Sequence, residues 1–368
     1  MHAPLPPAKG GLSVKRLAMF AASLLLWSWT AVAQQPPRFR ERVDVNVVLL
    51  DAIVTDSKGQ QILGLDQKDF VVKENGGEQT LDTADYFTNR QLLNAQEANA
   101  PFKVERTQQA RYFVFFFDKP EGGAFWDSLA MARRAGRDFV EKQMKPGDQI
   151  AVVAHDVRLK VYSDFTADKK QLLAALDEVG RFGKGLTSRG PAEGPSILRS
   201  VDADDMMSGS GTVYEGLEVL GQALRSIPAR KNLILFSAGI VERGQDIRDG
   251  VILNQSRYYQ PMIEALNSAN VTVYAMNLLR SQASDLPAVH QTLDQIAADT
   301  NGDYYRHPVS FEPLLRRIEQ ANNGYYLLTY RSNHPTGSSG FQRVEVSIRN
   351  QPRLRVKARE GYAYGLSE

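Results

Sequence analysis

The feature that most constrains this chain is a run of six large apolar residues that ends on a single carboxylate. It spans residues 111–118, RYFVFFFD, and no polar residue interrupts it before Asp118. A strand with both faces covered needs such a run, and the central strands of parallel sheets flanked by helices are in that position. Asp118 then stands at the carboxyl end of the strand, where ligands bind in open α/β sheets. We therefore expect the functional site near Asp118.

Further apolar strands alternate with stretches of helical spacing over residues 110–322. The predicted strands include QIAVVAH, KNLILFS and VTVYAMN, at residues 149–155, 231–237 and 271–277. Right-handed crossovers turn this alternation into an α/β fold with a doubly wound, mostly parallel sheet. Residues 180–211 are glycine-rich and predict a long loop of the kind that is functional or disordered. The acidic residues of this loop predict a solvated loop face, and they are Asp202, Asp204 and Asp205.

Both ends of the mature chain predict strands without helices. Residues 41–88 contain four or five short strands, and residues 323–364 contain three more. Neither set alone closes a well-covered sandwich. We therefore predict one β-sandwich formed by the N- and C-terminal strands, with the α/β domain inserted between its halves and residues 89–109 as a linker. The carboxyl-terminal strands are expected to cover Val45, Val47 and Leu49.

The first 33 residues predict a signal peptide. Lys9, Lys15 and Arg16 precede an apolar run, and Ala31-Val32-Ala33 gives the small-x-small pattern that signal peptidase cleaves. The apolar run is shorter than the roughly 20 residues of a membrane-spanning helix. We expect an exported protein, periplasmic or extracellular, that begins at Gln34, and the alternative is an uncleaved membrane anchor.

Composition excludes several chemistries. The chain has no cysteine, which rules out disulfides, zinc–thiolate sites and a cysteine nucleophile. Removing the three cations of the first 33 residues leaves 41 of the 44 Lys and Arg residues against 42 Asp and Glu residues. A nearly neutral mature chain gives no reason to expect nucleic acid as a partner.

Three segments carry a resemblance to a known family. Asp118 after an apolar strand, Gly211-Thr212 opening a helix, and LILFSAG at residues 233–239 stand in the order and spacing of a von Willebrand factor type A domain. Over nearly the whole mature chain, the sequence also resembles VWFA-related exported proteins that are abundant in acidobacteria. The blocks that carry this second resemblance are VDVNVVLLDAIVTDSKGQQILGLDQKDFVVKENG, GDQIAVVAHDVRLKVYSDFTADKKQLLAAL and YYLLTYRSN with EGYAY. These resemblances imply a type A fold and an exported protein.

Type A domains bind Mg²⁺ through a DxSxS strand end, a Thr and a second Asp, and the resemblance carries this pattern over only in part. Asp118 matches the first Asp and Thr212 matches the Thr, whereas Pro120, Gly122 and Ala238 replace three ligands. A hard cation wants a full set of oxygen ligands. We therefore interpret Asp118 and Thr212 as a degenerate metal site and expect no cofactor, bound Mg²⁺ included.

These features favour a non-enzymatic, adhesion-type module that binds a protein or cell-envelope partner. The loops at the carboxyl edge of the sheet are the predicted contact surface, with Asp118, Lys119, Glu121, Thr212 and Ser237 as partner-binding residues. We expect Asp118→Ala to weaken binding without changing the melting temperature. Membrane contact would come only through an uncleaved signal segment, and the oligomeric state stays open.

Two alternatives remain at this stage. One is a structural or scaffold subunit of an envelope complex that contacts its partners through the sandwich. The other is a hydrolase using His155 and Asp156, with Ser237 as a nucleophile. The sequence around Ser237 lacks the Gly-x-Ser-x-Gly turn that such a nucleophile needs.

Overall fold

A computed structural model describes most of the chain from residue 46 onward. The described ranges are 46–57, 60–88, 104–105, 110–119, 126–181, 183–187, 194–227, 229–240, 247–248, 251–252, 256–279, 287–306, 308–322, 324–332 and 340–364. The predicted signal peptide (residues 1–33) and Glu121 lie outside these ranges.

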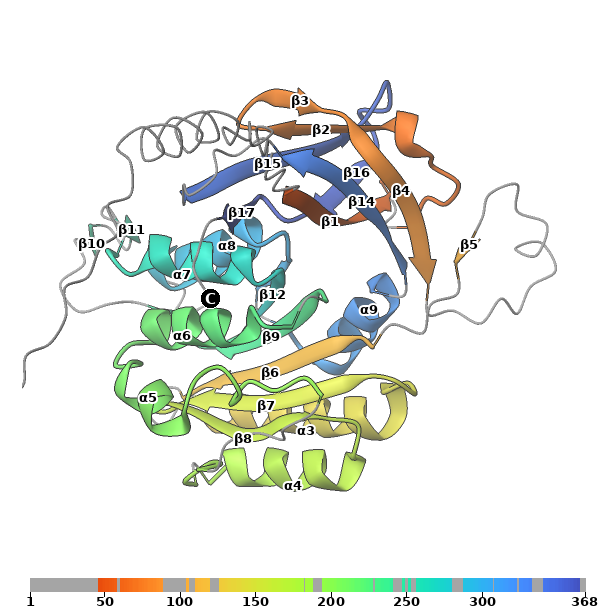
Figure 1. The fold of residues 1–368 in the computed structure, drawn as a ribbon. Helices are drawn as coiled ribbons and strands as arrows, with labels where there is room; N and C mark the ends of the chain where they lie inside the picture. The colour runs from red at the N-terminus through yellow and green to blue at the C-terminus, as the bar shows by residue number, and fades with distance from the viewer. Residues whose placement is uncertain are drawn as a thin grey trace, which may run out of the picture. The chain divides into compact units, whose positions relative to one another are not determined.

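The centre of the α/β part is a six-stranded sheet with strand order β13-β12-β9-β6-β7-β8 (Figure 1). Its strands are β6 (Tyr112–Asp118), β7 (Gln149–His155), β8 (Leu159–Thr166), β9 (Lys231–Ser237), β12 (Val271–Asn277) and β13 (Tyr304–Tyr305). All neighbouring pairs are parallel except β7 and β8, which form an antiparallel hairpin. The predicted central strand is confirmed, because β6 lies between β9 and β7 and residues 113–117 are fully buried.

Helices cover both faces of this sheet, and the parity of each strand residue decides which face it joins. Val114 and Phe116 pack with α5, α6, α7 and α8, whereas Phe113 and Phe115 pack with α3, α4 and α9. The helices are α3 (Trp126–Asp138), its π-helical continuation η3 (Phe139–Gln143), α4 (Lys169–Val179), α5 (Ala203–Ser208), α6 (Val213–Leu224), α7 (Tyr259–Ser268), α8 (Pro287–Asp299) and α9 (Glu312–Ala321). The doubly wound α/β fold is therefore confirmed. None of the helices in the described ranges is long and apolar enough to cross a membrane.

The terminal segments form two further sheets that enclose their own core. One sheet has the order β16-β1-β14-β4-β5 and the other the order β17-β15-β2-β3. The strands are β1 (Asn46–Thr55), β2 (Phe70–Glu74), β3 (Gly77–Gln79), β4 (Leu81–Thr88), β5 (Val104–Glu105), β14 (Gly324–Ser332), β15 (Gly340–Ile348), β16 (Arg355–Ala358) and β17 (Gly361–Tyr364), with the short helix η1 (Gln67–Asp69) before β2. Strand β1 pairs with β14, and β2 pairs with β15, so each sheet joins amino-terminal to carboxyl-terminal strands. Outside these three sheets, β10 (Ile247–Arg248) and β11 (Val251–Ile252) form a two-stranded hairpin.

The face of β1 that meets the sandwich core differs from the predicted one. Val48 and Leu50 are buried in the core at 4% and 0% exposure, whereas Val47 and Leu49 are 53% and 47% exposed. The prediction that the carboxyl-terminal strands cover Val47 and Leu49 was wrong. Both alternating sets are apolar at this end of β1, so the pattern does not distinguish the two faces.

Asp51 lies on the same face of β1 as Val47 and Leu49, but it is buried by a contact with the α/β part of the chain. Asp51 is 9% exposed and accepts a hydrogen bond of 2.7 Å from the Asn270 side chain, which precedes β12. Lys357 of β16 pairs with Asp303 at 2.6 Å across the same junction. These contacts tie the sandwich to the amino-terminal ends of the parallel strands β12 and β13.

Part of the loop predicted over residues 180–211 is fixed by a buried carboxylate. Asp164 of β8 is 6% exposed and accepts hydrogen bonds of 2.7 Å from the Ser196 hydroxyl and 2.8 Å from the Ile197 amide. Asp202 is the N-cap of α5, with its side chain accepting from the Asp204 amide at 2.9 Å. The acidic cluster therefore begins a short helix, and its three carboxylates are exposed, so the predicted solvated face is confirmed at the start of a helix.

Candidate functional site

Four polar residues end four adjacent strands of the parallel sheet. They are His155 of β7, Asp118 of β6, Ser237 of β9 and Asn277 of β12. The register pairs Asp118 with His155 and Ser237 with Asn277, so the four lie at one level of the sheet. All are buried, with exposures of 6%, 7%, 0% and 1% in the order above. We call them the polar row. Side chains alternate between the two faces along a strand, and these four residues fall on the face that α6 and α8 cover.

The centre of the polar row is a hydrogen-bonded pair. The Ser237 hydroxyl donates to Asp118 Oδ2 at 2.6 Å and accepts from the Gly239 amide at 3.1 Å. Gly239 has a φ of +118°, a backbone conformation that suits glycine. Both hydrogen-bonding capacities of the hydroxyl are thus used inside the fold. Ser237, predicted to contact a partner, is fully buried and would act on a ligand only through Asp118.

His155 is held by the segment that precedes α6. Its Nε2 lies 3.1 Å from the Ser210 carbonyl oxygen, and only a protonated nitrogen can donate to a carbonyl, so Nε2 carries the proton. Burial lowers the pKa of His155, and the bond to Ser210 opposes this shift only in part. Gly216 of α6 permits the close approach, because a Cβ there would lie 3.1 Å from the imidazole Cδ2. His155 is therefore a neutral, packed side chain.

These contacts do not support the hydrolase alternative. The Ser237 hydroxyl donates to Asp118, and the His155 Nε2 donates to Ser210. A serine nucleophile needs its hydroxyl within reach of a general base whose orientation is fixed by a third group. Neither bond provides that arrangement.

Thr212, the second predicted metal ligand, forms a capping box at the start of α6. Its hydroxyl accepts from the Glu215 amide and donates to Glu215 Oε2, both at 3.1 Å, and its amide donates to the same carboxylate at 2.9 Å. A capping box satisfies two amides at the beginning of a helix. Thr212 thus has a complete structural role.

The residues present fit a Mg²⁺ site poorly. Mg²⁺ demands nearly octahedral oxygen coordination at about 2.0–2.1 Å, whereas the Asp118 carboxylate is bonded to Ser237 and the Thr212 hydroxyl to Glu215. Within the described ranges, no three His, Asp or Glu side chains are grouped to hold a metal ion. The metal-binding behaviour of Asp118 and Thr212 stays a prediction.

The other predicted contact residues divide between the described and undescribed parts. Lys119 is half-buried, and its amide donates to the His155 carbonyl oxygen at 2.9 Å, which extends the β6–β7 pairing by one residue. Ala238 is partly buried against the α3 face of the sheet. Glu121 lies outside the described residues.

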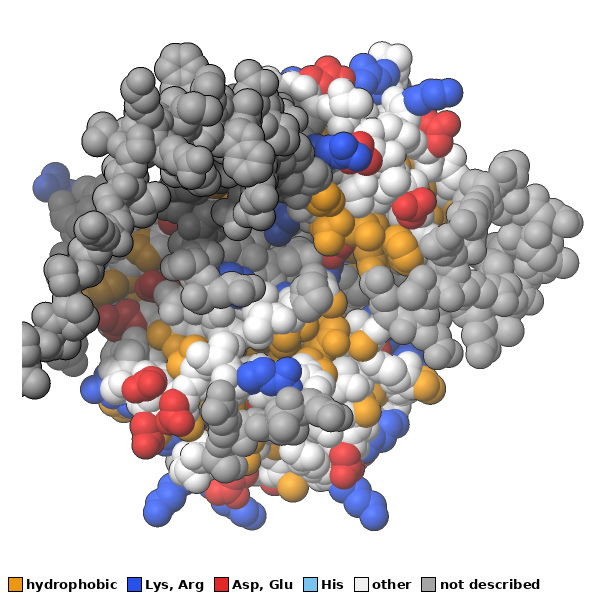
Figure 2. Space-filling view, in the orientation of Figure 1, with side chains coloured by type: hydrophobic (Ala, Val, Ile, Leu, Met, Phe, Trp, Pro, Cys, Tyr) orange, Lys and Arg blue, Asp and Glu red, His pale blue; other side chains and the backbone are white. Residues whose placement is uncertain are grey.

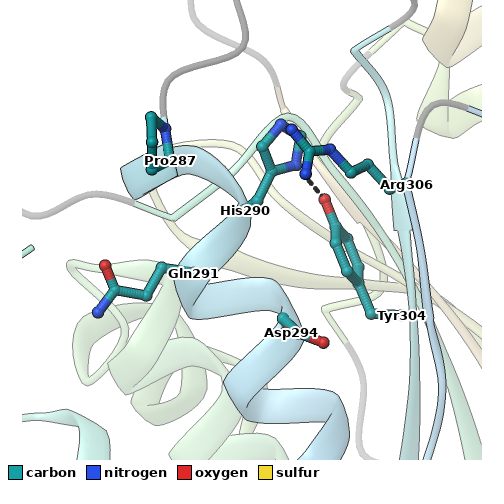
Figure 3. A pocket seen from close by; sticks show the side chains of 6 residues that line it. All are labelled: Pro287, His290, Gln291, Asp294, Tyr304 and Arg306. Atoms are coloured by element: carbon teal, nitrogen blue, oxygen red, sulfur yellow. Dashed lines mark hydrogen bonds between the residues drawn. The ribbon is translucent and has the colours of Figure 1, made fainter. Parts of the chain in front are cut away.

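Sequence reasoning missed the end of the polar row at Asn277. The Asn277 side chain contacts His290 Nδ1 at 3.0 Å and donates to the Tyr304 hydroxyl at 2.9 Å. His290 and Tyr304 line a pocket of about 360 Å³ between α8 and β13 (Figure 3). One signal was available, because Asn277 ends the apolar run VTVYAMN just as Asp118 ends its own.

Comparison with known proteins gives similarities of structure only. No family model matches the chain, and no curated protein matches it. The vWF domain of the type V pili tip protein Mfa5 from Porphyromonas gingivalis is 12% identical with a TM-score of 0.39, and the match covers 59% of this chain and 96% of that one. BatB from Bacteroides thetaiotaomicron is 12% identical with a TM-score of 0.36, covering 58% of this chain and 97% of that one. Human Sec24c is 11% identical with a TM-score of 0.38, covering 69% of this chain and 43% of that one, less than half of its length.

We assign the fold from the strand order and register of the chain itself, and the three similarities carry no functional conclusion. The class is a doubly wound α/β domain, which is the fold that the resemblance to type A domains implied. It stands in the chain between the two halves of a β-sandwich, because β1 and β14 flank it and pair with each other.

Proposed function

We propose that this protein is an exported, non-enzymatic binding module that recognises a protein or envelope partner through the carboxyl edge of its six-stranded sheet. The resemblance of the sequence to VWFA-related exported proteins is one reason for this proposal. The polar row is closed by hydrogen bonds within the fold, so recognition is assigned to the loops around it. Binding residues on loops held by a rigid sheet can vary without disturbing the core.

The observation that carries the proposal is where exposed apolar side chains lie. Among the described residues, the two most exposed large apolar side chains are Val309, at 87%, and Val157, at 73%. Val309 follows β13, Val157 follows β7, and Trp126, which is 42% exposed, follows the loop after β6. All three lie beyond the carboxyl ends of parallel strands.

Val157 also has an unfavourable backbone. It stands at the tip of the β7–β8 hairpin with a φ of +78°, a region that β-branched residues rarely adopt. Such strain costs on the order of 1–3 kcal/mol and is concentrated at functional sites. An exposed valine in this conformation gains no packing energy inside the fold, whereas contact with a partner would bury it.

The edge that carries α4 has an ordinary solvated surface. Figure 2 shows Lys and Arg side chains interspersed with Asp and Glu side chains along the edge that carries α4. Exposed ion pairs there, such as Arg137 with Asp177 at 2.8 Å, are of the kind that contributes little to stability.

The test is capture of proteins from an envelope extract of the source organism on the immobilised full chain. Val157→Asn with Val309→Asn removes two apolar contacts, and asparagine tolerates the left-handed backbone at position 157. We expect this double variant to keep its melting temperature and to lose most of a saturable, crosslinkable partner. Unchanged capture would refute the proposal.

One observation favours the scaffold alternative, and it supplies the matched control. Val47 and Leu49 form an exposed apolar pair on the outer face of β1. Val47→Thr with Leu49→Thr removes this apolar pair and places β-branched side chains, which suit a strand, at both positions. Loss of capture by this variant alone would transfer the contact surface to the sandwich.

A further inference from the structure

Positive charges gather where the sandwich meets the α/β part of the chain. Arg230 and Lys231 stand at the start of β9, and Arg359 lies between β16 and β17. Among the described residues, Asp51 of β1 is the only carboxylate whose charge affects the pKa of Lys231 or Arg359. All four side chains are buried or half-buried. We call these four residues the junction cluster, in which three cations stand against one carboxylate.

The carboxylate of Asp51 does not pair directly with any of the three cations. Asp51 Oδ2 accepts from the Asn270 side chain at 2.7 Å, and none of the described cations lies within ion-pair distance of Asp51. The register of β1 with β16, continued by one residue, places Arg359 opposite Asp51. The Arg359 guanidinium nevertheless donates to the Leu49 carbonyl oxygen and lies 5.4 Å from the centre of the Tyr362 ring. The charges of the junction cluster therefore stand apart.

The cations of the junction cluster also have more donors than acceptors. The Nε atoms of Arg230 and Arg359 are buried and have no hydrogen-bond partner among the described residues. The Arg230 side chain makes no hydrogen bond to any part of the chain that the structure describes. The Lys231 ammonium, which has three donors, bonds to the Ile227 carbonyl oxygen at 2.5 Å. Buried charges in proteins are normally paired and hydrogen-bonded, so the junction cluster lacks a counter-charge.

We propose that the junction cluster binds a small oxyanion of the phosphate, sulfate or carboxylate class, held by Arg230 from the α/β part and by Arg359 from the sandwich. A guanidinium suits an oxyanion because its planar fork donates two parallel hydrogen bonds. Arg230 can turn toward the anion at little cost, because no hydrogen bond within the described structure holds it. A bound anion supplies the missing counter-charge and ties the two parts of the chain together.

This site lies away from the surface assigned to partner recognition. Lys231 begins β9, whereas the recognition loops follow the carboxyl ends of the parallel strands. The inference therefore goes beyond the proposed partner contact and does not depend on it.

The experiment is calorimetric titration of the full chain in Hepes buffer with sodium phosphate, sulfate, acetate and chloride, all at the same ionic strength. We expect saturable binding of at least one oxyanion and weaker binding of chloride, which lacks the paired oxygens that a guanidinium fork contacts. Preference for phosphate and sulfate identifies a site for a tetrahedral anion, and preference for acetate identifies a site for a carboxylate.

Arg230→Gln keeps the test independent of folding, because this side chain has no hydrogen bond to lose within the described structure. The variant should weaken oxyanion binding by about tenfold or more, since hydrogen bonds to a charged group are lost. Without an oxyanion it should melt at the same temperature as the wild type or a higher one, because an uncompensated charge is removed. With saturating oxyanion it should melt at a lower temperature than the wild type.

Arg225→Gln is the matched control, because Arg225 is an exposed arginine at the end of α6. It should bind the oxyanion as the wild type does. Absence of saturable binding by every oxyanion, binding of chloride as tight as that of the oxyanions, or equal effects of Arg230→Gln and Arg225→Gln would overturn the assignment. Protein capture by the loops would be unaffected by that outcome.

Discussion

Lys231 makes the stability of this protein depend on pH in a direction opposite to that of an ordinary lysine ion pair. It begins β9, is 1% exposed, and donates to the Ile227 carbonyl oxygen at 2.5 Å. Burial lowers the pKa of Lys231 from 10.5 to about 7, and the nearby Asp51 carboxylate opposes the shift only in part. The half-buried Arg359 adds a like charge that lowers it further.

The sign follows from proton uptake. Between pH about 7 and 10.5, the unfolded chain holds the Lys231 proton and the folded chain does not. The free energy of unfolding therefore rises with pH in this window, by about 1.4 kcal/mol per pH unit for one proton. Over the whole window this corresponds to roughly 5 kcal/mol. Below pH about 7 both states are protonated, and the cost of burying the charge is fully present.

The measurement is guanidinium-induced unfolding of the wild type and of Lys231→Met at several pH values from 6 to 9.5. The difference between the two curves cancels the other titrating groups, and we expect it to favour the wild type increasingly above pH about 7. Lys170→Met changes an exposed lysine and should run parallel to the wild type. Parallel curves for the wild type and Lys231→Met would show that this ammonium is not perturbed in the fold.

Two further predictions concern the residues first assigned to a metal site. Thr212→Ala should lower the free energy of unfolding by about 1 kcal/mol through loss of the helix cap, equally with and without millimolar Mg²⁺; a Mg²⁺-dependent rise in melting temperature that this variant abolishes would show that Thr212 is a ligand. Asp118→Ala should cost about 1–3 kcal/mol, because the buried Ser237 hydroxyl loses its acceptor. This replaces the expectation of an unchanged melting temperature, and thermal unfolding of Asp118→Ala and Asp118→Asn decides between the two.

The parallel sheet could be predicted because its signals are local. The run before Asp118 has no polar residue, and the strands QIAVVAH, KNLILFS and VTVYAMN are likewise short and largely apolar. The capping box was also within reach, since Thr212 and Glu215 have the T-x-x-E spacing that marks the start of a helix.

The features that escaped prediction depend on contacts between distant segments. The two faces of β1 look alike in sequence until Asp51, whose burial depends on Asn270, a residue 219 positions away. The pocket depends on α8 lying against β13, which no periodicity specifies. The fixed part of the long loop depends on Asp164, and a single acidic residue in a strand gives no indication of its partners.

The closed polar row determines where recognition can occur. A ligand that reached Asp118 or Ser237 would have to replace buried hydrogen bonds, and each buried polar group left unpaired costs about 1–3 kcal/mol. A ligand at the hairpin tip of Val157 replaces none of these bonds. The polar row therefore stays intact when a partner binds, and contacts made by the loops beyond it cost the least free energy. We expect such an edge to select its partner by apolar contact at the loop tips, and the variants at Val157 and Val309 test this expectation.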